Sequence, residues 1–103
     1  MLEILRRRLE AVPTGKRKMN VLLIDDDREC LESLSAALRL NGIGVTAFHS
    51  PAKAVRRYHP DTVDAVITDY HLAKTKGTEV VKKIRKKNKN ARGNAVKAFY
   101  AIP

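Results

Sequence analysis

With 103 residues, the chain is expected to form one compact domain, and its 44% apolar and 31% charged residues exclude a disordered or fibrous protein. The net charge of +10 is concentrated near the two ends. Residues 1–18 carry six basic and two acidic groups, and residues 82–103 carry eight basic groups and no acidic one. Residues 19–81 carry seven basic and nine acidic groups, so the charge of the whole chain is a poor guide to function.

The spacing of apolar residues predicts helices and strands in alternation. Leu2, Leu5 and Leu9 form one stripe of a short amphipathic helix over residues 1–12. Residues 20–24 form an apolar run that is typical of a strand buried on both faces. The elements predicted after it are a helix capped by Asp27 and stopped at Asn41–Gly42, a strand at Gly44–Phe48, a helix from Ser50–Pro51 to about Tyr58, a strand at Asp64–Asp69, and a helix from Thr78 to about Asn88.

Residues 95–102 are harder to interpret. Their apolar content fits a fourth strand, although apolar and polar residues alternate poorly. Strands separated by helices favour right-handed βαβ crossovers, which place parallel strands in one sheet. The predicted fold class is therefore α/β, with an open parallel sheet and helices on both of its faces.

Two of the predicted strands end in aspartate. Asp25 and Asp26 follow the strand at 20–24, and Asp69 ends the strand at 64–69. Ligands of open parallel sheets bind beyond the carboxyl ends of the strands, so the three carboxylates can converge if these strands are neighbours. Two such charges about 4 Å apart repel by roughly 4 kcal/mol at an effective dielectric near 20, and a cation would relieve that repulsion.

Mg²⁺ suits such a cluster, because it binds one or two carboxylates, keeps several waters and accepts a phosphoryl oxygen. An aspartate beside this ion could act as a nucleophile towards phosphorus. The other interpretation is that Asp25–Asp27 only begin and cap the following helix. The pattern by itself leaves both interpretations open.

The sequences around these aspartates, VLLIDDD at 21–27 and VITDYHL at 66–72, resemble the receiver domain of two-component response regulators. The resemblance extends over about residues 19–88. It implies a flavodoxin-like fold and a signalling module that is not an enzyme. It also implies that a histidine kinase or a phosphotransfer protein supplies a phosphoryl group.

Carried over by position, the resemblance implies that Asp69 is the phosphoacceptor. It also implies that Mg²⁺ is bound by Asp25, Asp26 and Asp69, together with the backbone carbonyl of His71. Gly77 matches the loop glycine that the family has eight positions after the acceptor. The acid pair, acceptor and glycine in this register are more specific together than any one of them alone.

The chain departs from the family pattern in its second half. Ala73 stands where the family has a proline four residues after the acceptor. A receiver domain over residues 19–103, incomplete at its C-terminus, is therefore expected. The Thr/Ser and the Lys that contact the phosphoryl group in the family cannot be placed, and Lys74 and Lys97 match no motif.

Residues 1–18 are predicted to be a separate basic, amphipathic segment. Without the last helix of the family, the sheet face beside the first receiver helix would be uncovered. The leucine stripe of the N-terminal segment could pack there. A disordered leader and self-association as a homodimer are the open alternatives.

Two other functions compete with phosphoryl transfer. The chain could be a degenerate receiver that serves as a protein-interaction or dimerisation module, or a fragment of a longer regulator. The basic residues of 82–92 could bind nucleic acid non-specifically through its phosphates. A basic run of this kind is usually a solvated helix face, so nucleic acid is not an expected partner.

The remaining reactive residues indicate no further chemistry. His49, His59 and His71 lack the spacing of metal ligands, which argues against a zinc site. Cys30 cannot form an intramolecular disulfide and is expected to be a small packing residue, with no lowered thiol pKa because aspartates lie close by. The apolar run 21–24 is far too short for a membrane span, so no membrane association is expected. The single cysteine and the lack of an apolar signal segment before the domain favour a reducing cytoplasm.

Overall fold

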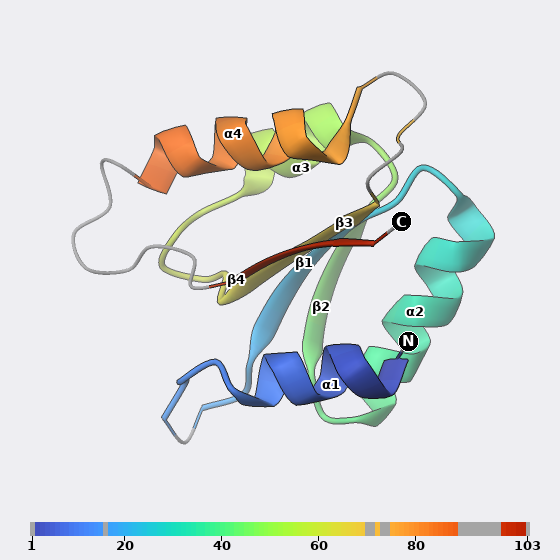
Figure 1. The fold of residues 1–103 in the computed structure, drawn as a ribbon, viewed down its shortest axis with the longest axis vertical. Coiled ribbons are helices and arrows are strands. Elements are labelled where there is room, and N and C mark those ends of the chain that lie inside the picture. Colours follow the sequence, from blue (N-terminus) through green and yellow to red (C-terminus); the bar gives the residue numbers. More distant parts are fainter. Residues whose placement is uncertain (1, 16, 70–71, 73–74, 89–97, 103) are drawn as a thin grey trace.

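The computed structural model describes residues 2–15, 17–69, 72, 75–88 and 98–102 (Figure 1). These residues form four helices that alternate with four strands. In chain order, the elements are α1 (Leu2–Glu10), β1 (Asn20–Ile24), α2 (Arg28–Leu40), β2 (Gly44–Phe48), α3 (Pro51–Arg57), β3 (Ala65–Asp69), α4 (Gly77–Asn88) and β4 (Ala98–Ile102).

The four strands are parallel and form one sheet with the order β2-β1-β3-β4. β1 and β3 are direct neighbours, with Val21 opposite Ala65 at the start of their register. β4 lies at the edge of the sheet, with Ile102 opposite Asp69. The predicted α/β class, the parallel sheet and the fourth strand are confirmed. Residues 95–97 of that strand prediction lie outside the described residues.

The helices cover both faces of the sheet, with α1 and α2 on one side and α3 and α4 on the other (Figure 1). Val21 and Leu23 of β1 belong to the core on the α1–α2 side, and Leu22 and Ile24 belong to the core on the α3–α4 side. A strand that is covered on both faces needs an apolar side chain at every position. This is why β1 is apolar from Val21 to Ile24, whereas its exposed first residue is Asn20.

α1 closes the sheet face beside α2. Leu5 and Leu9 are buried, with 5% and 0% of their surface exposed, in the same cluster as the apolar side of α2. The hypothesis that the leucine stripe packs on this face is confirmed for these two residues. A disordered leader is wrong for residues 2–10, which are helical. The side chain of Leu2 lies outside the described part of the molecule.

An ion pair ties the segment between α1 and β1 to the start of β3. The guanidinium group of Arg17 donates two hydrogen bonds to the carboxylate of Asp64, and the one from Nη1 to Oδ2 is 2.7 Å long. The backbone N–H of Asn20 donates to the same carboxylate at 2.8 Å, and Asp64 is buried. A domain boundary after residue 18 stays a prediction.

Side-chain caps begin α2 and α3 where they were expected. Asp27 accepts a hydrogen bond from the backbone N–H of Cys30 at 3.2 Å, and Ser50 accepts one from that of Lys53 at 3.3 Å. The side chain of Cys30, however, is exposed. Its predicted packing role is therefore wrong, because the first turn of α2 faces solvent at this position.

The predicted helix boundaries differ from the observed ones by one or two residues. α1 ends at Glu10 instead of Val12, α3 ends at Arg57, and α4 begins at Gly77, one residue before Thr78. Helix ends pass gradually into turns, so the spacing of apolar residues does not locate them closely.

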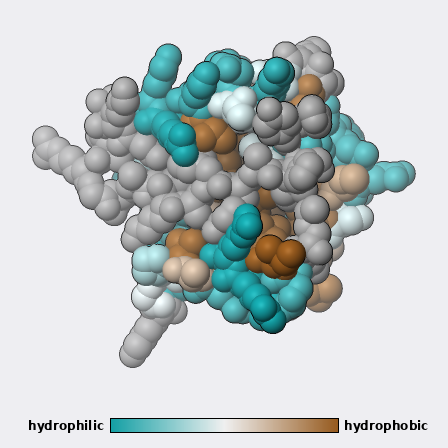
Figure 2. Space-filling model, viewed as in Figure 1, coloured by the Kyte–Doolittle hydropathy of each residue, from teal (hydrophilic) through white to brown (hydrophobic). Residues whose placement is uncertain are grey.

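The two helical layers differ in charge. α3 and α4 carry eight basic residues and one acidic residue, whereas α1 and α2 carry five basic and four acidic residues. Hydrophilic side chains accordingly cover much of the α3–α4 side, at the top of Figure 2. No helix in the described residues has both the length and the apolar content to cross a bilayer.

Candidate functional site

The aspartates at the ends of β1 and β3 meet at the carboxyl edge of the sheet. One carboxylate oxygen from each of Asp25, Asp26 and Asp69 lies within 4.8 Å of the other two. Asp25 and Asp69 are half-buried, and Asp26 is exposed. The expected convergence therefore occurs, because the sheet order makes β1 and β3 neighbours.

The surroundings of Asp25 make its negative charge costly. Burial raises the pKa of this carboxyl group, and the hydrogen bond that it accepts from the backbone N–H of Asp27 at 2.9 Å opposes that effect. The neighbouring negative charges of Asp69, Asp26 and Asp27 raise the pKa further, so the net shift is upward. A cation at this edge of the sheet would remove much of the cost.

The donor atoms of the cluster fit a hard divalent cation. Carboxylate oxygens are the protein ligands that Mg²⁺ prefers, and one or two of them usually suffice beside water molecules. Elsewhere in the described residues, no three His, Cys, Asp or Glu side chains bring their ligand atoms this close together. The roles of Asp25, Asp26 and Asp69 as metal ligands stay predictions.

Asp27, the third residue of the acidic run, has a different role. Its Oδ1 accepts the hydrogen bond from the backbone N–H of Cys30, as an N-cap does. The capping interpretation therefore holds for Asp27, whereas Asp25 and Asp26 lie with Asp69. The carboxylate of Asp27 also interacts with the thiol of Cys30 and raises its pKa, so the thiol has no lowered pKa, as expected.

Gly77 lies against the backbone of the predicted acceptor. A Cβ atom at this position would overlap the carbonyl oxygen of Asp69 and stand 3.2 Å from its carbonyl carbon. The buried hydroxyl of Thr68 donates a hydrogen bond to the same carbonyl oxygen at 3.0 Å. Glycine thus allows the start of α4 to approach Asp69 closely.

Thr68 is a site residue that the sequence reasoning missed. It is fully buried in β3, directly before Asp69, and its hydroxyl contacts the backbone of that residue. The sequence feature that could have indicated this role is a polar residue directly after three apolar residues of the strand. Buried hydroxyl groups need a hydrogen-bond partner, so a threonine at such a position indicates a local contact.

Four of the predicted positions lie outside the described residues: His71, Ala73, Lys74 and Lys97. The backbone of β4 is described, and it contains neither serine nor threonine. Ile102 is the β4 residue opposite Asp69, so this strand places neither a serine nor a threonine opposite the acidic cluster.

Sequence comparison agrees with the geometry of the site. The model of a family described as "Response regulator receiver domain" matches residues 21–96. The response regulator MprA of Mycobacterium avium (strain 104) is 34% identical over 67 residues, which cover 65% of this chain and 29% of MprA. The chain thus matches less than a third of the length of that relative. It belongs to the response regulator receiver domain family, whose members are signalling modules of two-component systems.

Solved receiver structures share the fold. The non-phosphorylated HemR receiver domain from Leptospira biflexa has a TM-score of 0.67 and 22% identity, with 84% of this chain and 83% of that chain covered. TrrA from Thermotoga maritima, in complex with Mg(2+)-BeF, has a TM-score of 0.65 and 23% identity, with 82% and 87% covered. TrrA in complex with the histidine kinase ThkA has a TM-score of 0.64 and 22% identity, with 82% and 86% covered. The flavodoxin-like receiver fold is thereby confirmed.

Proposed function

We propose that Asp69 accepts a phosphoryl group in two-component signal transduction, with Mg²⁺ held by Asp25, Asp26 and Asp69. The observation that carries this proposal is the convergence of the three carboxylates at the carboxyl edge of the sheet. Membership of the receiver family supports it, and so does the TrrA structure with Mg(2+)-BeF.

The residues of the cluster have distinct parts in this reaction. A carboxylate oxygen of Asp69 forms the new P–O bond while the P–N bond to a donor phosphohistidine breaks, and the released imidazole nitrogen takes up a proton. Bound Mg²⁺ supplies positive charge that lets an anionic phosphoryl group approach a carboxylate. The Thr68 hydroxyl donates a hydrogen bond to the backbone carbonyl of Asp69, and Gly77 leaves room for that carbonyl beside α4, so both residues help to position Asp69.

A histidine kinase or a phosphotransfer protein is the proposed donor, and the cytoplasm is the proposed location. The complex of the neighbour TrrA with the histidine kinase ThkA supports a donor of this kind. The carboxyl edge of the sheet holds the half-buried Asp69 beside the exposed Asp26. A donor imidazole would therefore approach from this edge.

Intact-mass analysis after incubation with acetyl phosphate and Mg²⁺ tests the proposal. The parent protein should gain one phosphoryl group, and Asp69→Ala should gain none. Asp61→Ala is the matched control, because Asp61 is an exposed aspartate outside the cluster and its loss should leave phosphorylation intact. An unmodified parent, or equal modification of Asp69→Ala, would contradict the proposal.

The register of β4 favours one alternative. Ile102 lies opposite Asp69, and β4 contains no serine or threonine. The alternative is therefore an interaction or dimerisation module whose oligomeric state does not change on phosphorylation. Light scattering coupled to size-exclusion chromatography should then show the same dimer with and without acetyl phosphate. A monomer under both conditions would contradict the dimerisation module.

A further inference from the structure

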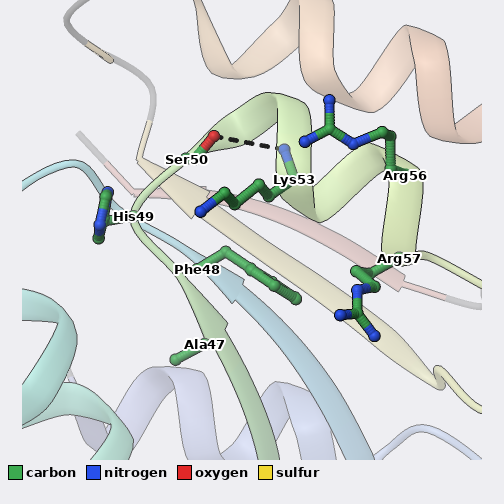
Figure 3. A pocket seen from close by; sticks show the side chains of 7 residues that line it. All are labelled: Ala47, Phe48, His49, Ser50, Lys53, Arg56 and Arg57. Atoms are coloured by element: carbon green, nitrogen blue, oxygen red, sulfur yellow. Dashed lines mark hydrogen bonds between the residues drawn. The ribbon is translucent and has the colours of Figure 1, made fainter.

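A pocket that contains none of the clustered aspartates opens beside the outer edge of β2 (Figure 3). Its volume is about 510 Å³, which lies in the range of small-molecule sites. Residues 47–50 form one side, at the end of β2 and in the turn that follows. Lys53, Arg56 and Arg57 of α3 form the other side.

The pocket is strongly positive. Lys53, Arg56 and Arg57 are exposed, and none of the described residues that line the pocket is acidic. In the described part of the chain, no carboxylate forms an ion pair with any of these three side chains. Three positive groups around one hollow repel each other, and an anionic ligand would relieve that repulsion.

An aromatic ring and an open strand edge complete the pocket. Phe48 is half-buried against the α3–α4 core, and in Figure 3 its ring lies between Lys53 and Arg57. The carbonyl of Phe48 accepts a hydrogen bond from Asp25 N–H at 3.2 Å, on the β1 side of the strand. Because successive residues of a strand alternate, the N–H and C=O of Ala47 face the outer edge of the described sheet.

We propose that this pocket binds a nucleoside triphosphate. The phosphoryl oxygens bind the ammonium group of Lys53 and the guanidinium groups of Arg56 and Arg57, which match phosphate in charge and hydrogen bonding. The base stacks on the exposed part of the Phe48 ring, and the free backbone groups of Ala47 offer its polar edge one donor and one acceptor.

A nucleoside triphosphate would contact both the cations of the pocket and Phe48, whereas nucleic acid would contact only the cations. Nucleic acid bound non-specifically needs only positive charge, so it would use the basic residues of α4 as readily as those of α3. A nucleotide in the pocket needs the cations and Phe48 together. The two kinds of binding therefore respond differently to substitutions in α3, in α4 and at position 48.

Isothermal titration calorimetry with ATP and GTP tests the proposal, with EDTA present and at physiological ionic strength. EDTA removes divalent cations, so the nucleotide cannot be held at the acidic cluster through a metal. Adenosine and inorganic triphosphate are titrated in parallel. The nucleoside triphosphates should bind more tightly than either, because only they carry both the phosphoryl groups and the base.

Paired substitutions locate the binding site. Lys53→Gln combined with Arg56→Gln should weaken nucleotide binding by about tenfold or more. Lys82→Gln combined with Lys86→Gln removes the same charge from the exposed side of α4, and should change the affinity little. Phe48→Leu should weaken binding of ATP but not of inorganic triphosphate.

Three results would overturn the proposal: equal losses from the two double variants, inorganic triphosphate binding as tightly as ATP, or no binding by the parent. Circular dichroism confirms that each variant is folded at the titration temperature. Lys53 and Arg56 are exposed, so that double variant is expected to fold. If Phe48→Leu unfolds, the test still rests on two measurements. They are the affinity of the Lys53→Gln/Arg56→Gln variant for nucleotide and the affinity of the parent for inorganic triphosphate.

Discussion

Asp25 sits at the carboxyl end of β1 with its charge partly buried beside other carboxylates, and its pKa is raised above the ordinary value of 3.8. A carboxyl group whose pKa is raised in the folded state binds its proton more tightly there than in the unfolded chain. In the metal-free protein, the contribution of Asp25 to stability should therefore become more favourable as the pH falls through the raised pKa towards 3.8. At neutral pH, the ionised carboxylate opposes folding until a cation binds.

Asp25→Asn should remove both the destabilising negative charge at this position and one proposed ligand of the cation. In EDTA at pH 7, we expect the variant to be more stable than the parent by about 1 kcal/mol or less, because the carboxylate is partly hydrated. The parent should gain about 2.7 kcal/mol when Mg²⁺ is present at about 100 times its Kd, and the variant should gain much less. Thermal unfolding followed by circular dichroism measures both effects.

Asp61→Asn is the control for this prediction, because it removes an exposed aspartate outside the cluster. It should respond to Mg²⁺ as the parent does. If Asp25→Asn gained as much stability from Mg²⁺ as the parent, Asp25 would not be a ligand.

Gly77→Ala should strain the contact between α4 and Asp69. The added Cβ atom would overlap the carbonyl oxygen of Asp69, so either the helix or the acceptor must move. We expect a loss of about 1–3 kcal/mol in the free energy of unfolding and slower phosphorylation. Urea denaturation and intact-mass kinetics measure these changes. Thr78→Ala, at the exposed next position of α4, should leave both nearly unchanged, and equal effects would argue against the close contact.

At the scale of elements, α1 tests whether the N-terminal residues belong to the core. Leu9 is fully buried on the α2 side of the sheet, whereas Ile4 of the same helix is 60% exposed. Leu9→Ala should lower the free energy of unfolding by about 2–5 kcal/mol, because it leaves a cavity. Ile4→Ala should change it by about 0.5 kcal/mol or less. Urea denaturation that found equal, small effects would show that α1 does not pack on the sheet.

At the scale of the whole molecule, the Arg17–Asp64 pair joins segments that lie 47 residues apart in the sequence. Asp64 is buried and Arg17 is half exposed, so the carboxylate depends on the guanidinium and on Asn20 N–H for hydrogen bonds. A double-mutant cycle of Arg17→Gln and Asp64→Asn should give a coupling free energy of about 1–3 kcal/mol in urea denaturation.

The exposed pair of Arg6 and Glu10 in α1 is the matched control. Arg6 Nη1 lies 2.7 Å from Glu10 Oε1, but both side chains reach solvent. A double-mutant cycle of Arg6→Gln and Glu10→Gln should therefore give a coupling free energy of about 0.5 kcal/mol or less. Equal coupling in the two cycles would show that burial of Asp64 does not strengthen its ion pair.

Much of the fold could be predicted from local patterns. The apolar run of β1 and the caps Asp27 and Ser50 are confirmed, because they depend on residues close together in the chain. Cys30 was predicted wrongly, because its burial depends on how α2 lies on the sheet. Thr68 was missed for a similar reason, since its buried hydroxyl has a role only beside the backbone of Asp69.

The sequence by itself determined the alternation of helices and strands, the aspartates at two strand ends, and the resemblance to receiver domains. These features depend on local spacing, which the order of residues records directly. Only the tertiary structure decided that β1 and β3 are neighbours, that α1 packs beside α2, and that the α3 cations share a pocket with Phe48. Such contacts join distant parts of the chain, and the packing of whole elements selects them.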